Sequence, residues 1–140
     1  MREKRSDFFE NIRKAALIQR EYAMRNPRGH KWYGENYWGF TASDGPGPRT
    51  ARIDGVNHRF LGYAARSMPY GPDDGTISPA AAFGTIPFAP DIVLPAIRQI
   101  SQRHPSIAGN YRVPNALNPT MTIDDALGWV SDGYFGRIRA

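Results

Sequence analysis

The sequence contains no cysteine, which excludes a disulfide scaffold and any metal site built on thiolates. Its three histidines, His30, His58 and His104, lack the spacing of metal ligands. It also has no glycine-rich phosphate loop, no dinucleotide-binding glycine motif and no G-x-S-x-G serine motif. We therefore expect no metal and no cofactor.

Long apolar runs are absent as well. None approaches the roughly 18 residues that a membrane span needs, so we expect no membrane span. The first residues, MREKRSDFFENIRKAA, are basic but carry no apolar stretch of the signal-peptide kind. The sequence therefore shows no export signal, and it leaves the localisation open.

The composition is that of a folded protein. The 140 residues are 41% hydrophobic and 12% aromatic, although they include 14 glycines and 12 prolines. Disordered chains are poor in aromatic residues, so this composition argues against disorder. The length predicts one domain over residues 1–140.

The positive charge is confined to one segment. Residues 1–31 hold nine lysines and arginines against four acids, whereas residues 32–140 hold nine of each. The basic residues alternate with apolar residues at helical spacing, which favours a solvated helix face over a nucleic-acid site. We expect no nucleic-acid partner; binding that falls steeply with salt would support the opposite reading.

Helical patterns recur along the chain. Apolar residues at steps of three and four predict a helix from Asp7, as its N-cap, to Asn26-Pro27. Ser78-Pro79 predicts the start of a second helix running to Thr85. A third is predicted from Pro90 to His104, with Pro95 inside it, and Thr122 and Asp125 predict a short fourth one ending at Trp129.

The rest of the chain is predicted to be mostly loop. Residues 28–77 are rich in glycine, proline and aromatics and contain no helical pattern. Alternation over Asn57–Tyr63 predicts a short strand or one arm of a hairpin. Residues 106–120 are predicted to be loop. Long loops of this composition are usually functional.

Several acidic residues lie close in the sequence to tyrosine or tryptophan residues. Glu35 lies two residues from Tyr37 and three from Trp38, Asp73 and Asp74 follow Tyr70, and Asp132 stands between Trp129 and Tyr134. Sugar rings pack on aromatic planes while their hydroxyls need polar partners, so this pattern suits carbohydrate. Turn formation by Asp-Gly and ordinary aromatic packing explain the same residues without a ligand. Calcium at Asp73 and Asp74 is less favoured, because the spacing of a calcium loop is missing.

Several long blocks resemble one known family, the glucoamylase-like domain proteins of bacteria, which include endo-β-1,2-glucanases. The blocks are DFFENIRKAALIQREYAMRNP, YGENYWGFTASDGPGP, YGPDDGTISPAAAFGTIPFAPDIVLPAIRQI and WVSDGYFG. The resemblance implies a mainly α chain: part of an (α/α)6 toroid with long loops and a short hairpin. It also implies action on β-linked glucan by an inverting route, in which one carboxylic acid protonates the leaving oxygen and a carboxylate activates water.

On this resemblance Glu35 is the candidate general acid. The candidate substrate-binding residues are Trp38, Asp44, Tyr70, Asp73, Asp74 and Asp132. The family's domain is longer and continues past the WVS-aromatic-G stretch into a Gln-Gly-Pro block, so residues 1–140 resemble its C-terminal part, incomplete at both ends. Many of the family's glucan-acting members are exported. Three functions stay open: a glucan hydrolase, a glucan-binding fragment without turnover, and a non-functional remnant that folds poorly alone. Self-association through exposed apolar helix faces is expected as well.

Overall fold

The computed structural model describes residues 2–105 and 112–137. Three helices are present in them, α1 (Arg2–Arg25), α2 (Pro79–Phe83) and α3 (Pro90–Arg103). Eight short strands are also present: β1 (Ala42–Ser43), β2 (Arg49–Ile53), β3 (Val56–Phe60), β4 (Ala64–Ala65), β5 (Arg112–Pro114), β6 (Leu117–Asn118), β7 (Trp129–Val130) and β8 (Tyr134–Arg137). Within the described ranges, no helix is both long and apolar enough to span a membrane.

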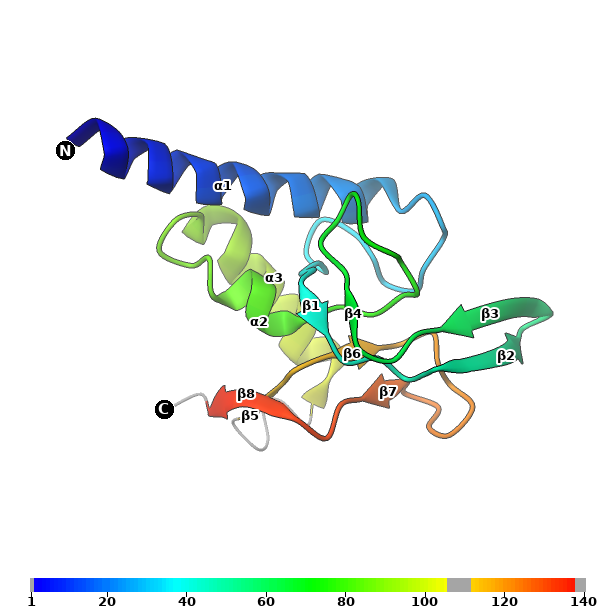
Figure 1. Ribbon diagram of the computed structural model, residues 1–140. Helices are drawn as coiled ribbons and strands as arrows, with labels where there is room; N and C mark the ends of the chain where they lie inside the picture. Colours follow the sequence, from blue (N-terminus) through cyan, green and yellow to red (C-terminus); the bar gives the residue numbers. More distant parts are fainter. Residues whose placement is uncertain (1, 106–111, 138–140) are drawn as a thin grey trace.

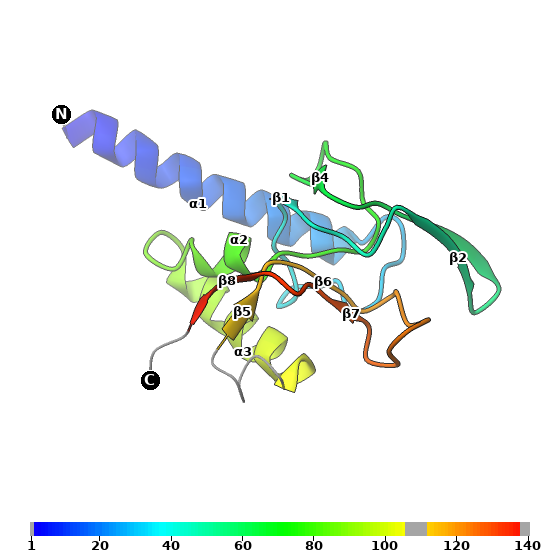
Figure 2. The same cartoon turned by 60° about the horizontal axis from the view of Figure 1, so that its bottom comes forward.

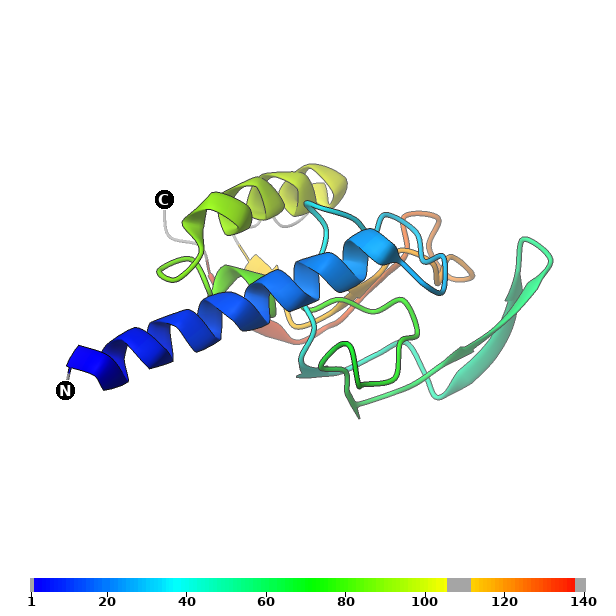
Figure 3. The ribbon, with the colours of Figure 1, turned by 90° about the horizontal axis from the view of Figure 1, so that it is seen from above.

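The helices form one layer of the molecule. The long helix α1 crosses over α2 and α3, and its N-terminal end extends beyond them (Figure 1). Phe8 and Phe9 contact Phe88, with ring centroids 6.0 and 5.3 Å apart. Arg13 of α1 forms a two-pronged ion pair with Asp91 at the start of α3, at 2.7 and 2.9 Å. Seen from above, α3 lies to one side of α1 and the β2–β3 hairpin to the other (Figure 3).

The helix ends test the sequence predictions. α1 begins at Arg2, so Asp7 lies inside the helix and the prediction that it caps the helix is wrong. The charged residues before it simply continue the helix. α1 ends at Arg25 as predicted, and the next residue, Asn26, adopts a left-handed φ of 43°. The side-chain amide of Asn26 donates to the carbonyl of His30 and accepts from the backbone amide of His30. α2 starts at Pro79 but is shorter than predicted, and α3 accommodates Pro95 in its interior.

The strands pair as four separate antiparallel ladders, β1–β4, β2–β3, β5–β8 and β6–β7. The β2–β3 hairpin projects from the body of the molecule, and the other ladders lie closer to the helices (Figures 1 and 2). The hairpin confirms the arm predicted over Asn57–Tyr63, although the strand itself runs over Val56–Phe60. Two predictions are wrong: the described part of the 106–120 loop contains β5 and β6, and residues 122–128 form turns that lead into β7 instead of a helix.

The core lies between the helix layer and the ladders. Its largest fully buried members are Tyr37, Trp38, Phe40, Ile77, Val93, Ile100 and Leu117, each no more than 1% exposed. A pair of backbone bonds between Ile77 and Leu117, both 2.8 Å, ties the segment before α2 to β6. The expectation of a mainly α chain therefore holds in part: the helices form one layer, and loops with short ladders form the other.

Candidate functional site

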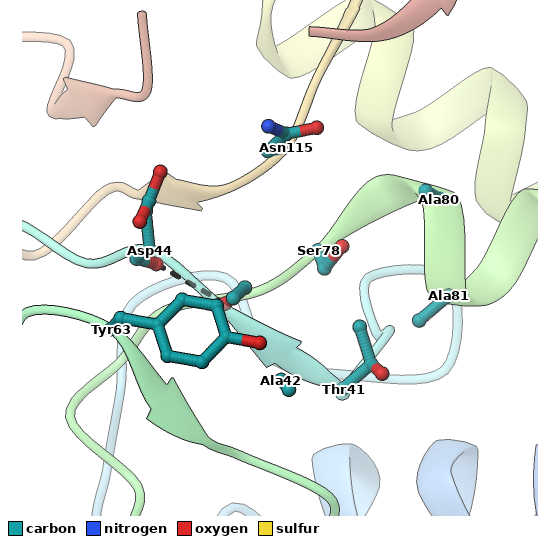
Figure 4. Close-up of a pocket in the computed structure, with 9 residues that line it drawn as sticks. Thr41, Ala42, Asp44, Tyr63, Ser78, Ala80, Ala81 and Asn115 are labelled. Carbon is teal, nitrogen blue, oxygen red and sulfur yellow. Dashed lines mark hydrogen bonds between the residues drawn. The ribbon is translucent and has the colours of Figure 1, made fainter. Parts of the chain in front are cut away.

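A cleft of about 360 Å³ lies where four segments meet, β1, the approach to β4, the start of α2 and the β5–β6 connection. Figure 4 shows Asp44, Tyr63, Ser78 and Asn115 arranged around this hollow. The residues that line it are Thr41, Ala42, Ser43, Asp44, Tyr63, Ser78, Ala80, Ala81 and Asn115. Among the candidates from the sequence, Asp44 is the one that lines this cleft.

The lining combines the chemical groups that a sugar needs. Asp44 supplies a carboxylate, Asn115 an amide, and Thr41 and Ser78 supply hydroxyls. Tyr63, which is 74% exposed, adds an aromatic ring at the rim. Carboxylates and amides can pair with sugar hydroxyls, while the apolar faces of a sugar ring pack against an aromatic ring.

Backbone hydrogen bonds fix the segments that carry these groups. The amide of Ser78 donates to the carbonyl of Gly39 (2.8 Å), and that of Asn115 donates to the carbonyl of Gly133 (2.8 Å). Ser78 stands at the N-cap position of α2, directly before Pro79. The cleft thus rests on ordered backbone on at least two of its sides.

The guanidinium group of Arg66 lies behind the cleft and is almost completely buried. It pairs with Asp74, with Nη2–Oδ2 at 3.0 Å and Nε–Oδ1 at 3.2 Å. Its remaining donors reach four backbone carbonyls, those of Ser43, Asp44 (3.2 Å), Leu61 (3.2 Å) and Gly62 (2.7 Å). One side chain therefore joins the two chain segments that carry Asp44 and Tyr63.

Asp74 is ionised in this arrangement. Burial alone would raise the pKa of its carboxyl, but hydrogen bonds from Arg66 and from the backbone amide of Leu61 outweigh burial and hold the pKa below its ordinary value. The Leu61 amide donates at 2.9 Å and that of Thr76 at 3.2 Å. A buried carboxylate with this many donors keeps its charge.

Gly45 and Gly47 allow the two segments to approach each other. A Cβ atom on Gly45 would lie 2.2 Å from Nη2 of Arg66 and 2.3 Å from the carbonyl oxygen of Leu61. A Cβ atom on Gly47 would lie 2.0 Å from the carbonyl oxygen of Phe60. The glycines of the SDGPGP stretch are therefore required by close backbone contact and not only by turn formation.

Asp73 lies in a second buried network, away from the cleft lining. The hydroxyls of Tyr22 and Tyr33 donate to its carboxylate at 2.6 and 2.8 Å, and the amide of Gly75 donates at 3.2 Å. Nε2 of His30 lies 3.3 Å from the same carboxylate, whose side chain is 2% exposed. Burial, and the charge and hydrogen bond of Asp73, raise the pKa of Tyr33 well above its ordinary value. Asp73 thus joins α1 to the loop before α2.

The other predicted site residues lie apart from the cleft lining. Glu35 stands at the tip of a tight turn between Gly34 and Tyr37, with its side chain 62% exposed and 3.1 Å from Arg20. Trp38 is fully buried in the core, whereas Tyr70 is almost fully exposed. Asp132 is exposed in the connection between β7 and β8. The roles predicted for these four residues stay predictions.

The site residues that the sequence did not single out include Tyr63, Arg66 and Asn115, together with the hydroxyls of Thr41 and Ser78. Tyr63 follows Gly62 in a predicted strand, so an exposed aromatic residue there was a usable signal. Nothing in the local sequence marks Arg66 or Asn115. The contacts that bring them to the site include distant partners, which are Ser43 and Asp44 for Arg66 and Gly133 for Asn115.

Comparison with known proteins shows the family of this chain. The family model Glycoamylase, described as "Putative glucoamylase", matches residues 1–138. The chain is 33% identical over 139 residues to an exo β-1,2-glucooligosaccharide sophorohydrolase (non-reducing end) from Parabacteroides distasonis. The match covers 99% of this chain and 16% of that protein.

Two solved structures are similar in fold and in sequence. The crystal structure of a putative glucoamylase from Bacteroides uniformis ATCC 8492 superposes with a TM-score of 0.66 at 35% identity, over 90% of this chain and 26% of the other. The endo-β-1,2-glucanase from Chitinophaga pinensis, in complex with sophorotriose and glucose, superposes with a TM-score of 0.56 at 29% identity, over 81% and 24%.

The fold and the matches over nearly the whole chain place it among the glucoamylase-like proteins. The chain belongs to the Glycoamylase family. It spans about a sixth of the curated relative and about a quarter of the two solved chains. The family resemblance read from the sequence is thereby confirmed.

Proposed function

We propose that this chain supplies part of the substrate groove of a glycoside hydrolase that acts on β-1,2-glucan. The observation that carries the proposal is the cleft in which Asp44, Asn115, two hydroxyls and the ring of Tyr63 face one hollow. Two of the similar proteins support the choice of glucan, since one is named as acting on β-1,2-glucooligosaccharides and the other was solved with sophorotriose.

Asp44 is the carboxylate placed to contact substrate in this proposal. Its side chain lines the cleft, while its own backbone carbonyl is held from behind by Arg66 and by the hydroxyl of Ser43 (3.1 Å). We propose that it accepts hydrogen bonds from glucose hydroxyls. Such bonds to an ionised group are stronger than bonds between neutral groups.

Glu35 is the competing carboxylate. An inverting glycosidase needs a general acid whose pKa is raised, and burial among apolar groups is the usual cause of that rise. Glu35 is instead largely exposed and paired with Arg20. Its proposed role as general acid therefore requires that substrate, or another part of a larger domain, cover it during the reaction.

The toroid belongs to the proposal too. We infer that the helix layer of α1, α2 and α3 is one part of an (α/α)6 ring whose loops form the groove. We accordingly propose glucan hydrolysis for the domain that contains the whole ring. The remnant reading differs in a measurable way, since a remnant would lack a cooperative unfolding transition.

Titration calorimetry with β-1,2-glucooligosaccharides tests the binding step. We expect Asp44→Asn to weaken binding at least about tenfold, because a charged acceptor is lost from the cleft. Asp54→Asn is the matched control, since Asp54 lies at the exposed tip of the β2–β3 hairpin. Equal affinity of the Asp44 variant and the wild type would refute the assignment.

Reducing-end release from β-1,2-glucan tests the chemistry. If Glu35 is the general acid, Glu35→Gln abolishes turnover and leaves oligosaccharide affinity intact. A variant with unchanged turnover would end that assignment.

Glucan binding without turnover is the second candidate function. Among the described residues, Asp44 is the one carboxylate that lines the cleft, whereas hydrolysis by inversion uses two. Calorimetric heat together with no new reducing ends would favour this second function for the chain.

A further inference from the structure

Two walls of the cleft come from separate segments of the chain, and both are hydrogen-bonded to the same buried side chain, that of Arg66. Thr41–Asp44 forms one wall, and the turn that contains Tyr63 forms another. Among the hydrogen bonds of the described residues, the guanidinium of Arg66 reaches both, through the carbonyls of Ser43 and Asp44 on one side and those of Leu61 and Gly62 on the other.

We propose that Arg66 is a positioning residue, which sets the separation and orientation of Asp44 and Tyr63 and thereby the affinity of the cleft for glucan. This inference rests on the proposed function, because the ligand is the same. Arg66 is not among the residues that line the cleft. It acts through the backbone on both sides of the cleft.

The chemistry of the arginine side chain suits this task. Its planar group offers five N–H donors in fixed directions, and here they reach the Asp74 carboxylate and four carbonyls together. Asp74 in turn receives the amides of Leu61 and Thr76, so the orientation of the guanidinium is itself fixed. A lysine ammonium has three donors at a single point and cannot reach both walls and the carboxylate at once.

Glycine at position 45 completes the arrangement. The segment after Asp44 passes so close to Arg66 and Leu61 that even one methyl group would overlap both. A substitution at Gly45 therefore disturbs the same separation as a substitution of Arg66, but it keeps both residues of the Arg66–Asp74 ion pair.

The test compares Arg66→Lys with Arg52→Lys, which changes an exposed arginine of the hairpin. We expect Arg66→Lys to bind β-1,2-glucooligosaccharides at least about tenfold more weakly than wild type, at a temperature where circular dichroism shows both fully folded, and Arg52→Lys to bind as wild type does. A folded Arg66→Lys variant with wild-type affinity would overturn the proposal. If the role of Arg66 were purely structural, Arg66→Lys would lower the melting temperature and leave the glucan affinity of the folded protein unchanged.

Two further measurements keep the test decisive. If Arg66→Lys fails to fold, Gly45→Ala takes its place, and wild-type affinity in that variant overturns the proposal. Amide ¹H and ¹⁵N shifts of Asp44 and Tyr63, recorded without ligand, must move in Arg66→Lys and stay in Arg52→Lys. These shifts report the positioning of Asp44 and Tyr63 even if the wild-type chain binds no glucan. Absence of binding by the wild type would refute the proposed function but not the positioning by Arg66.

Discussion

Asp73 shows how one buried carboxylate can hold several segments together. Its acceptors are used by Tyr22 from α1, by Tyr33 and by the backbone of Gly75. We expect Asp73→Asn to lower the free energy of unfolding by about 2–4 kcal/mol. The NH2 group of asparagine would face hydroxyl and amide groups that donate to the carboxylate in the wild type, so buried donors would lose their acceptor. Urea unfolding followed by circular dichroism measures this change.

Asp132→Asn is the control for Asp73, because Asp132 is exposed. Its effect on unfolding should stay within about 0.5 kcal/mol. A similar small effect for Asp73→Asn would show that the tyrosine network contributes little. An undiminished stability together with lost glucan binding would favour the substrate-binding role predicted from the sequence.

His104 makes folding stability depend on pH. Burial, together with the nearby charge of Arg103, lowers the pKa of its imidazole to about 4, and its Nε2 lies 2.8 Å from the hydroxyl of Tyr37. Between the ordinary value near 6.5 and about 4, the unfolded chain binds a proton that the folded chain does not. This group therefore stabilises the fold fully above pH 6.5, and up to roughly 3 kcal/mol is lost as the pH falls to about 4.

The measurement is the free energy of unfolding at pH 7.5 and pH 4.5. His104→Gln should lose less stability between these two values than wild type does, although it is less stable at pH 7.5. His58→Gln, on the hairpin, should keep the wild-type difference. Equal pH dependence in all three proteins would contradict the assignment to His104.

At the scale of elements, the β2–β3 hairpin depends on its two-residue turn. Asp54 and Gly55 both have positive φ, 50° and 78°, as the favoured type of tight hairpin turn requires. Gly55→Ala places a side chain at strained backbone and should destabilise the hairpin by about 1 kcal/mol. Amide hydrogen exchange of Arg52 and Asn57 measures this locally, and exchange in α3 should not change.

The elements also show what the sequence could and could not reveal. α3 was predictable because its apolar spacing, its initial proline and its final His-Pro all act within the segment. The two-residue ladders β1–β4 and β6–β7 were not, since their pairing depends on partners distant in the chain. The predicted helix before Trp129 failed for a local reason: the Asp125 carboxylate bonds to the amide of Leu127 (2.9 Å) in a turn and caps no helix.

For the cleft too, features set by the local sequence could be predicted, whereas features that depend on distant partners could not. Asp44 was a candidate from the sequence because of the unusual SDGPGP stretch, and it lines the cleft, while its role in binding stays a prediction. The position of Glu35 outside the cleft lining was not predictable, since it depends on how α1 and the following turn are oriented. Arg66 was equally hidden, because its neighbours in the sequence say nothing of the carbonyls that it reaches.

At the scale of the whole molecule, α1 contributes several of the exposed apolar side chains. Ile18 is 50% exposed and Met24 47%, and Leu17 and Ile18 border a groove of about 400 Å³ with Pro69. Exposed apolar surface of this kind favours association. We expect the chain to self-associate in a concentration-dependent manner, which sedimentation velocity between 5 and 200 µM, about the range for weak association, measures.

Ile18→Glu should shift this equilibrium toward the monomer, because a charge in the interface would lose its hydration. Arg52→Glu, which places the same side chain on the hairpin, is the matched control and should associate as wild type does. A wild-type chain that remains monomeric at the highest concentration would exclude self-association. Association unaffected by Ile18→Glu would instead place the contact elsewhere, with the exposed Leu94 of α3 as the next position to test.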